Sequence, residues 1–226
     1  MIDALASLPA LPARLRWVRL GSGDLDRVES LHRACAAGLP PRVVKPETHA
    51  FLADMLGGRG EALGIETEGQ QLIAYGFLQH DLLAQDDLRP ALGLSPSTPI
   101  AKLAGASVAP SHRRKGLQRS LIRARATLAS PQHLLFATAS PFNAPSWTNL
   151  LVEGLPIRRL EYRYGGHPRF IHARVPTGMP RVHQDDWQDV AGDDLPTHER
   201  LLADAHVGVS VTARGTVRYH REATAS

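Results

Sequence analysis

The stretch "SVAPSHRRKGLQRSLIRARATLA", Ser107 to Ala129, decides the fold class of this chain. An apolar, strand-like segment leads through a proline and a basic turn into a helix, whose apolar face is formed by Leu117, Leu121, Ala124 and Leu128. A strand that enters a helix through such a turn leaves N–H groups of the first helical turn pointing outward. Together with the positive end of the helix dipole, these groups form an anion site.

Side-chain charge adds to this turn. Arg113, Arg114 and Lys115 are basic, and Gly116 allows a phosphate to approach the backbone closely. A solvated basic helix start is the alternative, and the residues alone leave both interpretations open. Two other phosphate motifs are excluded, because the chain has no GxxxxGK[ST] and "GSGDLD" lacks the third glycine of GxGxxG.

The composition is that of a globular protein. Of 226 residues, 43% are hydrophobic and 21% charged, and the net charge of +4 favours an anionic ligand. The single cysteine, Cys35, excludes an internal disulfide and is expected in the core. The start of the chain is a poor match to a secretory signal, and no uncharged apolar run reaches about 18 residues. We therefore expect a cytoplasmic protein with no metal site and no membrane segment.

Strands and helices are expected to alternate along the chain. Helical spacing follows Asp24 and recurs in "PETHAFLADMLGG", "LIAYGFL" is apolar on both faces, and residues 82–99 form an irregular excursion. A hairpin is expected at 61–81 with its turn at 67–71, further strands at 14–20, 100–108, 133–140, 157–164 and 169–175, and a helix at 143–155. Such an order predicts an α/β layered fold.

From residue 176 the sequence becomes polar and rich in turn residues. "LPTHERLLADA" is a helix candidate, and "VGVSVTARGTVRYHR" is a hairpin candidate with its turn near Arg214 and Gly215. About 50 residues rarely support a core alone. We therefore expect a domain of residues 1–175 and a C-terminal α+β extension, 176–226, packed on it.

The segment "VAPSHRRKGLQRSLI" resembles motif A of the GNAT superfamily of N-acetyltransferases, V-x-P-x-x-R-G-x-G-[LI]-G/A-x-x-L. The matching residues are Val108, Pro110, Arg113, Gly116, Leu117 and Leu121. Arg114 stands where glycine is usual, and Gln118 replaces a small residue. The resemblance implies a mixed central sheet flanked by helices over residues 14–175.

A second segment, "ATASPFNAPSWTNLLVEGL", resembles a later motif of the same superfamily, N-x-x-[AS]-x-x-L-Y-x-x-x-G-F. Asn143, Ser146, Gly154 and Leu155 match it. Leu150 stands at the position of the tyrosine that in the family protonates the leaving CoA thiolate. Leucine cannot donate that proton.

The resemblance implies acetyl-CoA as cofactor. In the family, motif A holds the pyrophosphate, the preceding strand holds the pantetheine and the thioester carbonyl, and the later motif adds polar contacts. Carried over to this sequence, the cofactor-binding residues are Ala106, Ser107, Val108, Arg113, Arg114, Lys115, Gly116, Leu117, Gln118, Arg119, Asn143 and Ser146.

The catalytic groups are less defined. Many relatives use a carboxylate on the strand before motif A, where this chain has only Lys102 as a charged residue. His80 and Ser107 are the candidate catalytic residues, since histidine titrates near neutral pH and Ser107 lies in the thioester-binding strand. Both also fit ordinary roles, as an exposed strand-end histidine and a strand hydroxyl. Further candidates for the general base are Glu47, His49, Asp81, Asp86 and Asp87.

We therefore expect an acetyl-CoA-dependent N-acetyltransferase that acts on a primary amine of a small molecule or peptide by direct attack. A CoA-binding regulatory or interaction protein without turnover is the alternative. A nucleic-acid-binding module could use Arg119, Arg123 and Arg125, which could equally meet the CoA 3′-phosphate, but an aromatic content of 5% argues against base stacking. Aminoacyl-tRNA stays open as an acceptor, and so does a homodimer.

Overall fold

The computed structural model describes Leu5 and residues 7–223, which form two compact units. The first unit comprises the described residues up to Leu39 together with Pro46–Leu135. The second comprises Pro40–Lys45 and the described residues from Phe136 onward. The expected boundary between residues 175 and 176 lies inside the second unit, and the division into a domain and an extension stays a prediction.

Four antiparallel strands form the sheet of the first unit. Their order is β1 (Leu15–Arg19), β2 (Gly60–Thr67), β3 (Leu72–Gln79) and β4 (Ile100–Val108). Every residue of β3 is buried, as its apolar sequence on both faces predicts. This strand therefore has helices on both sides.

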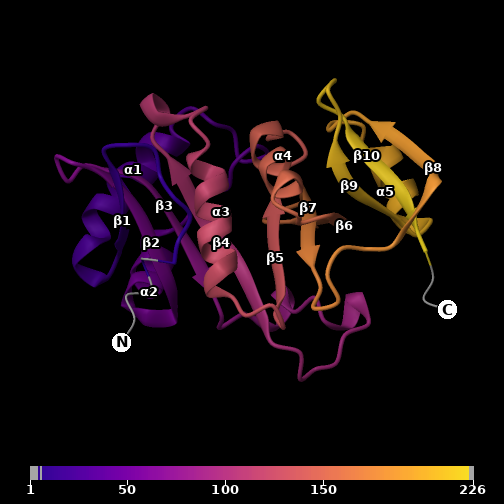
Figure 1. Ribbon diagram of the computed structural model, residues 1–226, viewed down its shortest axis with the longest axis horizontal. Coiled ribbons are helices and arrows are strands. Elements are labelled where there is room, and N and C mark those ends of the chain that lie inside the picture. Colours follow the sequence, from indigo (N-terminus) through magenta and orange to yellow (C-terminus); the bar gives the residue numbers. More distant parts are fainter. Residues whose placement is uncertain (1–4, 6, 224–226) are drawn as a thin grey trace. The chain divides into compact units, whose positions relative to one another are not determined.

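The helices α1 (Leu25–Ala36) and α2 (His49–Asp54) cover one face, where Val28 and Leu52 pack with Tyr75 and Phe77. The helix α3 (Leu117–Leu128) covers the other, and Figure 1 shows it lying over β4. Short helical turns complete the unit: η1 (Ser22–Asp24), η2 (Met55–Arg59), η3 (Ala84–Asp86), η4 (Pro90–Leu92) and η5 (Pro110–His112). The α/β class expected from the sequence is confirmed.

The chain continues through β5 (Leu134–Ala139), which begins in the first unit and enters the second. The remaining elements are α4 (Ala144–Val152), β6 (Ile157–Arg163), β7 (His167–Arg174), β8 (Val182–Val190), α5 (Leu195–Ala203), β9 (His206–Val211) and β10 (Val217–Glu222). Strands β7, β6, β9, β10 and β8 are neighbours in that order, and each neighbouring pair is antiparallel. The expected helix at 195–205 and the hairpin after it are both present.

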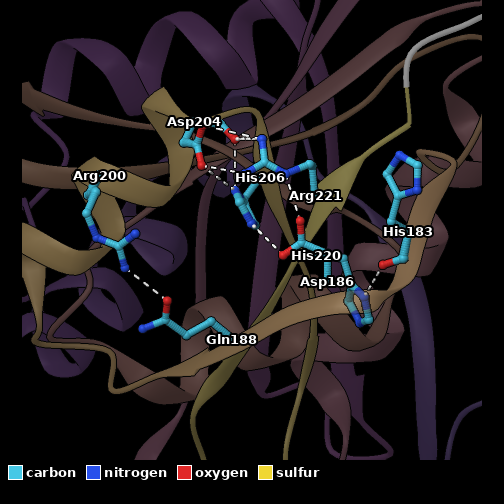
Figure 2. Close-up of polar contacts among 8 residues, drawn as sticks. All are labelled: His183, Asp186, Gln188, Arg200, Asp204, His206, His220 and Arg221. Atoms are coloured by element: carbon cyan, nitrogen blue, oxygen red, sulfur yellow. Dashed lines mark hydrogen bonds and ion pairs between the residues drawn. The ribbon is translucent and has the colours of Figure 1, made fainter.

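Strand β8 was not expected, because its sequence is polar and turn-like. Nearly all its side chains are exposed, so no apolar alternation marks it. Figure 2 shows the polar contacts that join it to its neighbours. Arg221 of β10 bonds to Asp186 of β8 and to Asp204, both at 2.7 Å, and the carbonyl oxygen of His183 bonds to His220 at 3.0 Å. No helix in the described part of the chain is long and apolar enough to cross a membrane.

Candidate functional site

A left-handed turn links β4 to α3. Arg114 and Gly116 both have positive φ, at 61° and 76°. Gly116 is the N-cap of α3, and the N–H of Ser120 donates to its carbonyl oxygen at 3.0 Å, which closes the first helical turn. Left-handed residues at a helix start direct successive N–H groups toward one concavity, and such concavities bind anions.

Open space lies beside this turn. A Cβ on Gly116 would meet no heavy atom of the described residues within 4 Å. A ligand anion can therefore lie against the backbone there, which is the fit that a pyrophosphate requires. Arg113, Arg114 and Lys115 are exposed around the turn, and the first turn of α3 has no acidic residue. The residues present fit the cofactor that the sequence implies.

Arg113 also has a structural part at this turn. Its Nη2 donates to the carbonyl oxygen of Cys35 at 3.3 Å, and its Nε to that of Val108 at 3.4 Å. The guanidinium thus joins the end of α1 to the end of β4. Its charge nevertheless remains at the exposed side of the turn.

A β-bulge interrupts the pairing of β3 with β4. Phe77 pairs with Ala104, but the residue before it, Gly76, pairs with Ala106. Gly105 is therefore the extra residue on β4. Gly105 has a φ of 21°. Because a bulge shifts the alternation of side chains by one position, it places Ser107 opposite Tyr75. Strand β4 therefore presents different residues after the bulge than a regular strand would.

Ser107 consequently faces a polar cluster under α1. The Tyr75 hydroxyl lies 2.7 Å from Nδ1 of His32. Burial raises the pKa of Tyr75, and the hydrogen bond to Ser107 opposes this only in part. Burial also raises the pKa of the Cys35 thiol, whose Sγ donates to the carbonyl oxygen of Val108 at 3.4 Å. At 8% exposure Cys35 is a core residue, as expected.

Glu47 lies nearer to the bulge than the other candidate bases. The nearest contacts of a Cβ on Gly105 would include Cγ of Glu47, at 3.5 Å. The backbone N–H of Glu47 donates to Nε2 of His32 at 2.8 Å, which ties this residue to the Tyr75 cluster. His49 instead lies 3.1 Å from Glu29 at the exposed start of α2.

His80 is distant from this cluster. It follows β3, and because Tyr75 faces Ser107, His80 lies about 17 Å along the strand from that level. Its Nε2 is 3.4 Å from Oε1 of Glu61, and its side chain is 40% exposed. The structure does not bring His80 and Ser107 together, and the catalytic roles of both stay predictions.

The second motif lies in the second unit. Asn143 is the N-cap residue of α4, and its carbonyl oxygen accepts from the N–H of Ser146 at 2.9 Å. Both side chains are half-buried. Leu150 is only 5% exposed and belongs to the buried face of α4 with Trp147 and Leu151. It is thus a core residue of this unit.

Many solved structures share this architecture, although no protein-family model and no curated protein matches the sequence. NAA60 from Arabidopsis thaliana, in complex with a bisubstrate analogue, superposes with a TM-score of 0.56 over 70% of this chain and 96% of its own, at 16% identity. The ribosomal-protein-S18-alanine N-acetyltransferase from Escherichia coli gives 0.53 over 76% and 97%, at 17% identity. An acetyltransferase of the GNAT family from Streptococcus pneumoniae gives 0.53 over 71% and 98%, at 12% identity.

The chain has the GNAT fold. The expected architecture, a central sheet flanked by helices, is confirmed by these superpositions. In this GNAT fold the β4–α3 turn is the segment that matched motif A in the sequence. The described residues contain no group of three or more His, Cys, Asp or Glu side chains that could hold a metal ion.

The sequence did not single out the buried polar groups of the GNAT fold. Tyr75 lies in an apolar strand, and His32 lies beside Leu31 on an amphipathic helix, and neither position marks a polar cluster in the sequence. Arg125 is one of the three helix arginines that the sequence offers as alternatives for binding nucleic acid or the CoA 3′-phosphate, and for Arg125 this alternative is wrong. Its side chain is 2% exposed, since its position on α3 faces the sheet.

Proposed function

We propose that this chain is an acetyl-CoA-dependent N-acetyltransferase that acetylates a primary amine. The observation that supports it most strongly is the β4–α3 turn, where left-handed Arg114 and Gly116 leave open, positively charged space at a helix N-terminus. That geometry accommodates a pyrophosphate, and it lies at the matching motif of a GNAT fold.

The proposed cofactor contacts are of two kinds. Backbone N–H groups and cations over Arg113–Arg119 would hold the phosphates, and the backbone of Ala106–Val108 would hold the pantetheine and the thioester. Asn143 and Ser146 stay proposed contacts on the strength of the sequence resemblance.

Bound acetyl-CoA would supply an activated thioester carbonyl. The acceptor nitrogen attacks the carbonyl carbon, so that a C–N bond forms and the C–S bond breaks. The amine loses one proton, and the departing thiolate takes up one. Backbone N–H groups of β4 after the bulge would stabilise negative charge on the carbonyl oxygen. Among the candidate bases, the position of Glu47 beside Gly105 favours it as the proton acceptor.

The base assignment is testable by substitution. Glu47→Gln is expected to lower kcat about 10²-fold or more if Glu47 takes the amine proton. His80→Gln and Ser107→Ala test the two catalytic residues expected from the sequence. If only His80→Gln lowers kcat, His80 and not Glu47 is the general base.

A CoA-binding protein without turnover is the second candidate. Leu150 in place of the tyrosine, and Lys102 as the charged residue of β4, favour this candidate. Thiol release from acetyl-CoA should be measured across small amines, peptides with an N-terminal alanine and aminoacyl-tRNA, beside calorimetric titration of CoA. Acetyl transfer to any acceptor supports the enzyme, CoA binding without thiol release supports the second candidate, and the absence of CoA binding contradicts both.

A further inference from the structure

Arg125 is a buried cation that the proposed chemistry does not use. On α3 its Nε donates to the carbonyl oxygen of Leu121 at 3.0 Å, and its Nη1 donates to those of Phe77 at 3.0 Å and Ala104 at 3.1 Å. Burial lowers its pKa to about 10, so the side chain still carries its charge at neutral pH. Burying a charge is unfavourable unless hydrogen bonds compensate it, and here the compensating oxygens are those of the main chain.

The two carbonyl groups that share Nη1 lie at the bulge. Phe77 and Ala104 are the last pair in regular register before Gly105 interrupts the ladder. A bulge disrupts the local pattern of interstrand hydrogen bonds. One guanidinium nitrogen therefore bonds to β3 and to β4 at the point where the two strands depart from regular pairing.

Gly76 makes room for this guanidinium. A Cβ on Gly76 would lie 2.9 Å from Cζ and from Nε of Arg125, closer than real Cβ atoms approach other atoms. Gly76 does not have a positive φ, so its backbone conformation does not require glycine. Space for Arg125 is the physical reason for a glycine here, and Gly76 is itself the residue on the other side of the register shift.

We propose that Arg125 is a positioning residue of the acetyl-transfer site, which fixes the β3–β4 bulge and thereby the backbone of Ala106–Val108. The proposal rests on the proposed function, because that backbone is where the thioester would lie. Arg125 acts through β4 and does not touch the substrate. Without the guanidinium, the bulge could shift or close, and a displacement of about 1 Å at the reacting centre can lower the rate about 10²-fold.

The first measurement does not depend on turnover. Amide hydrogen exchange of the full chain, followed by mass spectrometry, should show faster exchange over residues 104–108 in Arg125→Met than in the parent. Exchange in β1 should not change. Arg33→Met is the matched control, since Arg33 is also an α-helical arginine of the first unit but is 73% exposed in its side chain. It should leave residues 104–108 unaffected.

The second measurement separates positioning from overall stability. Well below the melting temperature of each variant, Arg125→Met should lower kcat by at least about tenfold while KM for acetyl-CoA and the CoA dissociation constant stay within about threefold. Arg125→Lys, which restores a charge without the planar fork, should recover part of kcat. A merely structural role would lower the melting temperature and leave kcat unchanged.

Gly76→Ala provides a second variant if Arg125→Met does not fold. The added methyl displaces the guanidinium, so exchange over residues 104–108 should rise in the same way. If the parent shows no acetyl transfer, the proposed function fails. The exchange data then still show whether Arg125 fixes the backbone of residues 104–108. Folded Arg125→Met or Gly76→Ala with parent-like exchange over residues 104–108 overturns the proposal.

Discussion

At Arg114 the chain keeps a charged side chain in a backbone conformation that favours glycine. Its φ is 61°, at the position where the family motif has glycine. Left-handed backbone costs a residue with a Cβ roughly 1–2 kcal/mol. The positive charge of Arg114 beside the proposed phosphate site would favour ligand binding, which explains why a residue other than glycine stands here.

Arg114→Gly is therefore expected to raise the free energy of unfolding by about 0.5–1 kcal/mol, because relief of the left-handed conformation exceeds the entropy that glycine loses on folding. Arg114→Ala removes the same charge but keeps the unfavourable φ, so it should be nearly neutral. Both should weaken CoA binding equally, by about 1 kcal/mol. Urea unfolding and calorimetric titration measure the two effects. An Arg114→Gly protein less stable than Arg114→Ala would contradict the left-handed assignment.

His172 of β7 is another residue whose environment sets its chemistry. It is fully buried, its Nδ1 lies 2.9 Å from the carbonyl oxygen of Leu155, and its Nε2 has no hydrogen-bond partner in the described chain. Burial lowers its pKa from 6.5 to about 4, against the opposing effect of the Leu155 bond. The folded state therefore holds a neutral imidazole where the unfolded state would be protonated.

Stability should consequently fall in acid. Above pH 6.5 both states are neutral at His172, and between 6.5 and about 4 only the unfolded state takes up the proton. The difference between the pKa of His172 in the unfolded and folded states corresponds to about 3 kcal/mol of stability lost by pH 4. Urea unfolding at pH 7.5 and at pH 4 gives the loss of free energy of unfolding in acid for each protein. This loss should be smaller in His172→Leu than in the parent by about 3 kcal/mol. Equal losses in the two proteins would show that His172 does not titrate in this range.

At the scale of elements, the β4–α3 turn meets two conditions that a pyrophosphate site at a helix N-terminus requires. Its backbone is left-handed at Gly116, and the space beside that residue is open. Only glycine adopts the left-handed conformation without strain, and the space beside it stays open only because glycine has no side chain. The turn and not an individual cation is therefore the proposed binding element.

Gly116→Val should abolish CoA binding, because a branched side chain fills the space where the pyrophosphate would lie. Gly215→Val is the matched control: Gly215 has the same φ of 76° and equally open surroundings, but it lies in the turn between β9 and β10. Both variants should lose about 1–2 kcal/mol of stability through the left-handed strain. Circular dichroism verifies folding, and calorimetry measures binding. A folded Gly116→Val protein with parent-like affinity would refute the pyrophosphate assignment.

At the scale of the whole molecule, a ligand that binds only the folded chain shifts its unfolding equilibrium. CoA at about 100 times its dissociation constant should add about 2.7 kcal/mol. For a chain of this size that corresponds to a rise in Tm of about 5–10 °C. Thermal unfolding with and without CoA measures it, and Gly116→Val should show no rise. An unchanged Tm of the parent at millimolar CoA would argue against any CoA site.

The sequence by itself determined the features that local chemistry encodes. Apolar segments and helical spacing predicted the alternation of strands and helices along the chain, and the all-apolar "LIAYGFL" predicted a strand buried on both faces. Proline, cations and glycine predicted the turn before α3. The helix and hairpin near the C-terminus followed from periodicity and turn residues in the same way. Each of these signals lies within a few residues of the element that it specifies.

Tertiary structure alone decided what depends on pairing between distant segments. The bulge at Gly105 exists only in the register of β4 against β3, and this register brings Ser107 to Tyr75. The burial of Arg125 depends on which side of α3 faces the sheet, and β8 is a strand because β10 supplies its partners. Neither long-range register nor the side-chain partners that follow from it can be read from local periodicity, because residues far apart in the chain set them.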